Sequence, residues 1–294
     1  MDFKQLNAFL AICGLLNFTK AAEQLGYAQS SITVQIQQLE EELGIKLFER
    51  IGKTVSLTHA GAQLVPYATQ ILQLSNGMKH AASSTDAPTG TLAIGAAESL
   101  SIFRLPALMK KYREIYPQVD IRLKLLSYSE FLPYLSNNMI DVAFSLGDYL
   151  KSEYIIEEMN LPEPISVLAY PGHPLTQKGK IGPDDIKNES LLLTGAGCCY
   201  RGAFIKFLAE NRIVPKIALE TDSIQAIKQA AMSGLGICVL PAISVAEEVL
   251  AGKLVPLDFT FKDFGIVSQL LYHKDKWRSP ALNAFLDLSK QMLM

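Results

Sequence analysis

The sequence predicts an α + α/β fold in which a winged helix-turn-helix and a long linker helix precede a two-lobed α/β domain. Three observations lead to this class. Short helical patterns and a hairpin fill the first 60 residues, a long amphipathic stretch covers 58–82, and strand and helix patterns alternate from Thr91 onward. Alternating strands and helices form parallel sheets covered by helices, which places the C-terminal part in the α/β class.

Length and composition agree with a folded protein of more than one domain. The chain has 294 residues, of which 49% are hydrophobic and 19% charged, with a net charge of −2. No stretch approaches the roughly 20 apolar residues of a membrane helix. The N-terminus also lacks a charged segment that leads into an apolar run and a cleavage site. We therefore expect a cytoplasmic protein that does not bind a membrane.

The first helices follow from the spacing of apolar residues. The first has them at intervals of three and four, namely at Leu6, Phe9, Leu10 and Cys13. Thr19 is expected to cap the second helix. The third runs from about Gln29 to Leu43, and Gly44 supplies its left-handed C-cap. Lys46–Arg50, a Gly52-Lys53 turn and Thr54–Leu57 then predict a hairpin, which completes a winged helix-turn-helix.

A longer helix is expected from Thr58 to about Ala82. Its apolar stripe comprises Leu64, Ala68, Ile71, Leu74 and Met78. No globular core lies beside this stripe in the sequence, so a second copy of the chain is the simplest partner. Pro66 interrupts the stripe and predicts a kink or a later helix start. Residues 83–90 have the composition of a linker.

The C-terminal part alternates strands with helices and is predicted to form two lobes. The strands are expected at Leu92–Ala96, Asp120–Leu126, Val142–Leu146, Ile165–Tyr170, Leu191–Thr194, Ile217–Glu220, Gly236–Leu240 and Ile266–Tyr272. The predicted domains are 1–58 for the winged helix-turn-helix, a DNA-binding motif, 59–90 for the dimerisation helix and linker, and 91–294 for the two-lobed domain. Lobe I takes about 91–162 and 267–294, and lobe II about 163–266.

Three stretches carry a family resemblance: FTKAAEQL (18–25) with QSSIT (29–33), LEEELGIKLFER (39–50), and VSLTHAG (55–61). Together they resemble the LysR-type transcriptional regulators. The rest of the chain fits more loosely, for example through Leu105-Pro106, Tyr116-Pro117 and Gly234–Ile237. The resemblance implies a homo-oligomer, a dimer or more commonly a homotetramer, that binds an imperfect palindrome in double-stranded DNA and responds to a small co-inducer. Whether it activates or represses is left open.

The third helix is the predicted reader of DNA. Residues 29–38 carry no charge, and Gln, Ser and Thr are the groups that hydrogen-bond base edges. Gln29, Ser30 and Thr33 lie opposite the apolar face and are expected to contact bases, whereas Gln37 and Gln38 would meet phosphate. The alternative is an ordinary polar surface helix. Family members often carry an arginine at the position of Val34, which leaves the recognised bases open.

Phosphate contacts are expected from Lys20, Arg50 and Lys53, with Glu40–Glu42 facing away. Residues 1–60 hold five basic and six acidic residues (Lys4, Lys20, Lys46, Arg50 and Lys53 against Asp2, Glu23, Glu40, Glu41, Glu42 and Glu49). Since such a domain attracts phosphate weakly, binding by a linked dimer or tetramer is needed.

The effector is expected beyond the carboxyl ends of the strands, between the lobes. The candidates are Ser99, Ser101, Ser127, Ser129, Cys198, Cys199, Arg201 and Ser223. Arg201 suits a carboxylate, so an anionic metabolite is expected, although a surface ion pair is the alternative role. Ser99 and Ser101 would otherwise cap a helix. We expect no cofactor beyond this effector.

Cys199 suggests a second function. Peroxide-sensing family members have a reactive cysteine, then a basic residue and a resolving cysteine; Cys199 and Arg201 resemble the first half, but Phe207–Ala209 replaces the partner. Thiol-based redox sensing through Cys199 is therefore an alternative.

Two other classes are disfavoured by sequence. A solute-binding protein has a similar two-lobed, periplasmic-binding-protein-like domain, but it requires a signal peptide and has no helix-turn-helix. An enzyme requires a catalytic pair or a metal cluster; we expect neither, because the four histidines and four cysteines show no such spacing.

Overall fold

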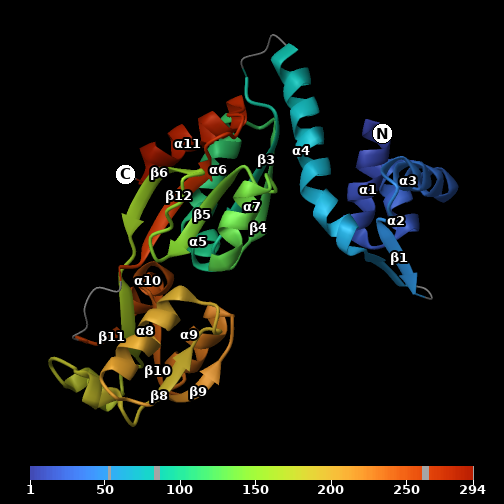
Figure 1. The fold of residues 1–294 in the computed structure, drawn as a ribbon. Helices are drawn as coiled ribbons and strands as arrows, with labels where there is room; N and C mark the ends of the chain where they lie inside the picture. The colour runs from blue at the N-terminus through green and yellow to red at the C-terminus, as the bar shows by residue number, and fades with distance from the viewer. Residues whose placement is uncertain (52–53, 83–86, 260–264, 294) are drawn as a thin grey trace. The chain divides into compact units, whose positions relative to one another are not determined.

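The structure, a computed structural model, describes residues 1–51, 54–82, 87–259 and 265–293. Two compact units make up the chain, the first centred on residues up to 86 and the second on residues 87–136 and 140–294 (Figure 1).

The first unit contains the expected short helices and hairpin. Its elements are α1 (Phe3–Leu15), α2 (Phe18–Leu25), α3 (Gln29–Leu43) and the antiparallel strands β1 (Phe48–Ile51) and β2 (Thr54–Leu57). Gly44 ends α3 with φ 68°, a left-handed conformation that glycine adopts without strain, as predicted. The expected cap of α2 is wrong: Asn17, not Thr19, accepts the Lys20 N–H at 3.0 Å.

The core of the first unit lies under α3 and the hairpin. Ile32, Ile36 and Leu39 of α3 are almost fully buried. The ring of Phe48 packs with its centroid 5.6 Å from each of the Phe9 and Phe18 rings. One face of α3 therefore packs into the core, and the opposite face is exposed to solvent and to other molecules.

The helix α4 (His59–Ala82) runs without interruption through Pro66, so the predicted later start is wrong. The apolar stripe on α4 has a packed part and an exposed part. Leu64, Ala68 and Ile71 pack into the core of the first unit, although no core was expected beside them. Leu74 and Met78 are 58% and 75% exposed. The part of the stripe that lacks a partner in the described chain is thus confined to the later turns.

The second unit holds two sheets. The first has the order β4-β3-β5-β12-β6 and the second β11-β7-β10-β8-β9. Their strands are β3 (Gly90–Ala96), β4 (Val119–Leu125), β5 (Val142–Gly147), β6 (Ile155–Pro162), β7 (Ile165–Ala169), β8 (Ser190–Leu193), β9 (Lys216–Glu220), β10 (Ile237–Pro241), β11 (Val255–Pro256) and β12 (Val267–His273). In each sheet the central neighbours are parallel, while β12 and β7 run antiparallel to theirs.

Helices cover the sheets, as Figure 1 shows for α6 and α11 beside the first sheet. The helices are α5 (Glu98–Phe103), α6 (Leu105–Ile115), α7 (Phe131–Ser136), α8 (Cys199–Glu210), α9 (Ile224–Met232), α10 (Ala242–Leu250) and α11 (Pro280–Leu293), with 3-10 turns at Tyr128–Glu130, Pro174–Gln177 and Pro183–Ile186. The strands β6 and β11 and the helix α10 do not follow from the sequence pattern.

One hydrophobic cluster runs through both sheets. It includes Ile94 and Phe144 of the first sheet and Leu168, Leu192 and Cys238 of the second. The two sheets therefore share a core.

A buried polar junction lies where the strands cross between the sheets. The Arg104 guanidinium forms an ion pair with Glu163 and donates to Ser268 Oγ at 2.7 Å. Nearby elements add a second junction, in which Lys228 Nζ donates to Ser244 O at 2.8 Å and lies 4.9 Å from the Phe103 ring centre. Both junctions join residues far apart in the sequence.

Candidate functional site

The exposed face of α3 presents the hydrogen-bonding side chains predicted to read DNA. Gln29, Ser30 and Gln37 are exposed, and Thr33 is half-buried. Gln29 Nε2 donates to Thr33 Oγ1 at 3.2 Å, and Thr33 Oγ1 donates to Gln29 O at 3.0 Å. These bonds hold the two side chains next to each other at the start of the helix.

Val34 is an apolar residue of the same helix. In the sequence it is distinguished only because family members often carry an arginine at this position. Its side chain is 48% exposed, on a helix surface otherwise made of polar groups. Solvent exposure, not sequence pattern, distinguishes Val34 from the buried Ile32 and Ile36.

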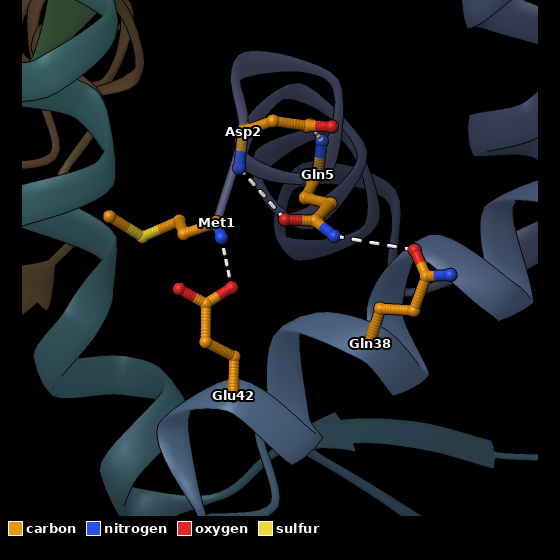
Figure 2. A network of polar contacts seen from close by, with 5 residues as sticks. All are labelled: Met1, Asp2, Gln5, Gln38 and Glu42. Carbon is orange, nitrogen blue, oxygen red and sulfur yellow. Dashed lines mark hydrogen bonds and ion pairs between the residues drawn. The ribbon is translucent and has the colours of Figure 1, made fainter.

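The far half of α3 is tied to α1. Figure 2 shows Gln5 Nε2 donating to Gln38 Oε1, at 3.4 Å, and the amino group of Met1 paired with Glu42. Asp2 and Gln5 form a reciprocal capping box at the start of α1. Gln38 therefore links α3 to α1, and its side chain is also exposed, so the phosphate contact expected from sequence stays a prediction.

Glu40 anchors the segment that leads into the hairpin. It is 8% exposed, and its carboxylate accepts the buried Leu47 N–H at 2.9 Å and pairs with Lys46 Nζ at 2.6 Å. From the sequence, Glu40 is expected only to face away from DNA. The structure gives it a further role, because its carboxylate joins the end of α3 to the start of β1.

Two of the three residues predicted to contact phosphate, Lys20 and Arg50, lie within the described residues. Lys20 is exposed in the first turn of α2. Arg50 belongs to β1 and pairs with Val55 in the hairpin. Lys53 lies outside the described residues.

The predicted effector residues of the first sheet follow β3 and β4. Ser99 and Ser101 lie in α5 and are buried; Ser101 Oγ donates to Glu98 O at 2.7 Å. Neither caps α5, because Ala97 is the N-cap residue. Ser127 forms a capping box with Glu130, and Ser129 Oγ lies 3.4 Å from Ser127 Oγ.

The predicted residues of the second sheet follow β8 and β9. Ser223 caps α9 by accepting the Ala226 N–H at 3.3 Å. Arg201 forms an ion pair with Glu220 at 2.7 Å, which is the alternative role considered for it. The Arg201 side chain is nevertheless largely buried, and its Nε has no hydrogen-bond partner within the described residues.

The structure brings the two sets of loops together at Cys199. Its Sγ donates to Leu146 O, at the end of β5, at 3.1 Å. A Cβ at Gly147 would lie 2.5 Å from the Tyr128 ring and 3.1 Å from Cys199 Sγ, so only glycine fits there. The Ser127–Ser129 segment, the end of β5 and the start of α8 thus meet at one place.

The two lobes also approach each other at a pair of carboxylates, Glu98 and Asp222. The pKa of the Glu98 carboxyl is raised above its ordinary value, first by burial and then by the charge of Asp222. Asp222 packs so closely on Gly195 that a Cβ there would lie 2.0 Å from Asp222 Oδ1. The start of α5 in one lobe and the loop after β9 in the other therefore face each other through the carboxylates of Glu98 and Asp222.

The two adjacent cysteines differ in their surroundings. The pKa of the Cys199 thiol is raised, by its contact with Cys198 and by burial. The pKa of the Cys198 thiol is lowered by hydrogen bonds, the largest effect coming from Cys199, while burial opposes the shift. Cys199 Sγ, the sulfur singled out by sequence, also donates to Leu146 O at 3.1 Å, a contact that favours the neutral thiol.

Within the described residues, no group of three or more His, Cys, Asp or Glu side chains is arranged to hold a metal ion. No helix in the described ranges is long and apolar enough to span a bilayer.

Comparison with known families gives two matches. Residues 3–62 match the bacterial regulatory helix-turn-helix protein model of the lysR family, and residues 85–294 match the LysR substrate binding domain. An uncharacterised HTH-type transcriptional regulator, YwqM of Bacillus subtilis (strain 168), is 39% identical over 99% of both chains. The HTH-type transcriptional activator CmpR of Synechocystis is 31% identical over 96% of this chain and 93% of that protein.

Solved structures share the fold. A full-length OxyR variant from Pseudomonas aeruginosa has a TM-score of 0.77 at 23% identity, covering 98% of this chain and 94% of that one. CbnR in complex with its target DNA has a TM-score of 0.66 at 22% identity, covering 99% of both chains. At these identities the likeness establishes architecture: an N-terminal helix-turn-helix followed by a two-lobed α/β domain.

Proposed function

Because the chain belongs to the LysR family of DNA-binding transcriptional regulators, we propose that α3 reads base pairs and that a small molecule bound to the second unit controls this reading. The observation that carries the proposal is the uncharged, hydrogen-bonding face of α3, which stands opposite its buried face. The helix enters the major groove with that face toward the bases.

In this proposal Gln29, Ser30 and Thr33 contact base edges, and Gln37 lies farther along. Glutamine pairs with adenine through two hydrogen bonds when its amide is free to turn. The bond from Gln29 to Thr33 would orient that amide before DNA arrives. Val34 adds an apolar contact to a thymine methyl group, and its truncation to alanine should cost about 1 kcal/mol, or roughly fivefold in affinity.

Lys20, Arg50 and Lys53 position the domain on phosphates. Three such contacts give a modest slope of log affinity against log salt, about −0.9 per contact. A single domain with this charge binds weakly, so an oligomer that presents two or more reading helices to an imperfect palindrome is part of the proposal. The exposed Leu74 and Met78 on α4 support pairing with a second copy of the chain.

The effector is proposed to bind where the loops after β3, β4, β8 and β9 meet. The unpartnered Arg201 Nε favours an acceptor such as a carboxylate. The carboxylates of Glu98 and Asp222 favour a donor on the same molecule. We therefore refine the expected anion to a small metabolite that carries both a carboxylate and a hydrogen-bond donor.

A gel-shift assay at stated salt, on the intergenic DNA beside the gene, tests the first half of the proposal. We expect a shifted band with this DNA at concentrations where random DNA of equal length stays free. If neither DNA shifts at low salt, the chain does not bind DNA as proposed.

Matched variants test which residues read sequence. Gln29→Ala should weaken binding to the operator by about 1–3 kcal/mol and leave random DNA nearly unaffected. Lys53→Ala should weaken both alike and lower the salt slope by about one. Equal losses on both DNAs for Gln29→Ala would remove Gln29 from base reading.

Thermal shift with three matched compounds tests the effector. An amino acid, the corresponding carboxylic acid and the corresponding amine are compared, with Arg201→Met and Glu98→Gln as variants. We expect the first compound to raise the melting temperature most and each variant to reduce its effect. An equal response to the amine alone would contradict the assignment to Arg201.

A further inference from the structure

The long helix α4 (Figure 1) carries large aromatic and aliphatic side chains that are open to solvent. Tyr67, Leu74 and Met78 are 63%, 58% and 75% exposed. They follow one another at intervals of seven and four residues, so they project from nearly the same side of the helix. Ile71 shares this side and is half-buried. We call the three exposed residues the open stripe of α4.

A cavity lies beside the first part of the open stripe. Its volume is about 180 Å³, and its lining comes from α1, α3 and α4, with Leu6, Leu43, Tyr67 and Ile71 among the residues. The lining contains no charged side chain. Leu43 and Tyr67 are both exposed, which places this apolar cavity at the surface of the first unit.

The cavity suits a flexible apolar side chain better than a metabolite. It is smaller than the roughly 300–1,000 Å³ of a site for a drug-sized ligand, and it offers no charged group to orient one. Methionine fills irregular apolar gaps, and its sulfur packs well on aromatic rings such as Tyr67. Met78 of the same chain lies eleven residues beyond Tyr67, about 16 Å along the helix, so it is too far away to enter.

The spacing of the stripe fits a pair of antiparallel helices with two-fold symmetry. Tyr67 lies as many residues before the midpoint between positions 72 and 73 as Met78 lies after it, and the same is true of Ile71 and Leu74. In an antiparallel pair with its two-fold axis at this midpoint, residues at equal distances on either side face each other. Met78 of one copy then meets Tyr67 of the other, and Leu74 meets Ile71.

We propose that two copies of the chain pair through antiparallel α4 helices in this register, with Met78 of each copy seated in the apolar cavity of the other. That the chain pairs through α4 rests on the proposed function, whereas the direction, the register and the use of the cavity go beyond it. The contact is the same on both copies and closes on itself, so this association stops at two chains.

A parallel pair leaves the cavities unused. It places each residue of the open stripe against the same residue of the other copy, so that Met78 meets Met78 and both cavities lie at the same end. In the antiparallel pair the two first units lie at opposite ends of the paired segment. The two reading helices are then related by a two-fold axis, as an imperfect palindrome requires.

Disulfide cross-linking of the full-length protein tests the direction. Tyr67→Cys and Met78→Cys, which carry tags of different size, are co-expressed and oxidised under mild conditions. We expect a linked dimer that contains one copy of each variant, because a disulfide needs Cα atoms within about 7 Å. Each variant alone should give little linked dimer, since its two new cysteines would lie about 16 Å apart. Wild-type protein oxidised in the same way measures any linkage through the native cysteines.

A charge at Met78 tests the cavity. Met78→Glu would place a carboxylate among apolar side chains and should raise the dissociation constant of the pair at least tenfold in sedimentation equilibrium. Met78→Leu keeps the volume and should pair nearly as well as the wild type. Ala62→Glu is the matched control, because Ala62 is exposed on another side of α4 and should leave pairing unchanged. Circular dichroism melting identifies any variant that fails to fold.

The outcomes separate this proposal from the proposed function. Linked dimers mainly within one variant would show a parallel pair, and equal effects of the two glutamates would show that Met78 does not enter the cavity; either result overturns the proposal. Dimers in the ultracentrifuge without the mixed disulfide would overturn the register and leave oligomerisation standing. A chain that stays monomeric would overturn both the pairing and the proposed oligomer and leave the cavity to another occupant, while the gel shift reports DNA binding separately.

Discussion

Replacing Glu40 tests whether its carboxylate holds the hairpin to α3. In Glu40→Ala the buried N–H of Leu47 loses its acceptor at 2.9 Å. An unsatisfied buried donor costs about 1–3 kcal/mol. The ion pair with Lys46 adds less than about 0.5 kcal/mol, because Lys46 is 74% exposed.

The expected loss for Glu40→Ala is therefore about 2 kcal/mol in the free energy of unfolding of the first unit. For a unit of this size that corresponds to a fall of roughly 10 °C in its melting temperature. Glu40→Gln keeps an acceptor for Leu47 but loses the charge, and it should cost about 1 kcal/mol. Lys46→Ala is the matched control and should cost less than about 0.5 kcal/mol.

Scanning calorimetry combined with hydrogen exchange measures these losses. The only tryptophan of the chain, Trp277, lies in the second unit, so its fluorescence reports whether that unit is unaffected. Exchange at the Leu47 amide should speed up by about thirtyfold in Glu40→Ala. If Glu40→Ala costs no more than Lys46→Ala, the carboxylate does not support the hairpin, and the reasoning is refuted.

Three further outcomes are expected from other positions. Gly61→Ala should destabilise the first unit by about 1–3 kcal/mol in urea unfolding, since its Cβ would lie 2.2 Å from a backbone carbonyl oxygen; an unchanged midpoint would contradict this contact. Glu98 has a raised pKa in the folded state because of burial and Asp222. The folded state therefore holds its proton to higher pH, and stability falls as pH rises from its unfolded value; Glu98→Gln should flatten that fall in Trp fluorescence melts at pH 4–7. Arg104→Met leaves the buried Glu163 unpaired and should cost about 3–5 kcal/mol by calorimetry, so a loss under 1 kcal/mol would show that the junction is not structural.

Much of the first unit could be predicted because its signals are local. The limits of α3 follow from a glycine that ends the helix and from apolar residues three and four apart. The cap of α2 was missed because Asn17 and Thr19 are both good caps, and only the backbone shows which one faces the free N–H groups. Pro66 does not delay the start of α4, because the helix continues on both sides of it.

The site was harder to predict because its contacts join distant parts of the sequence. Val34 and Gln38 lie four residues apart on α3 and both are exposed, yet Gln38 also accepts a hydrogen bond from Gln5 of α1. Cys198 and Cys199 are adjacent in the sequence, yet Cys198 is the N-cap residue of α8, whereas Cys199 Sγ donates to Leu146 O at the end of β5. Periodicity gives the face of a helix but not the partner across a loop.

The core shared by the two sheets of the second unit affects how such a domain can be altered. Leu168, Leu192 and Cys238 pack in the same cluster as Ile94 and Phe144. A fragment that contains one lobe alone would expose its half of that cluster to water, and a chimera with a foreign lobe would have to reproduce the opposite half. Changes of ligand preference are therefore more readily made in the loops after the strands than by exchange of whole lobes.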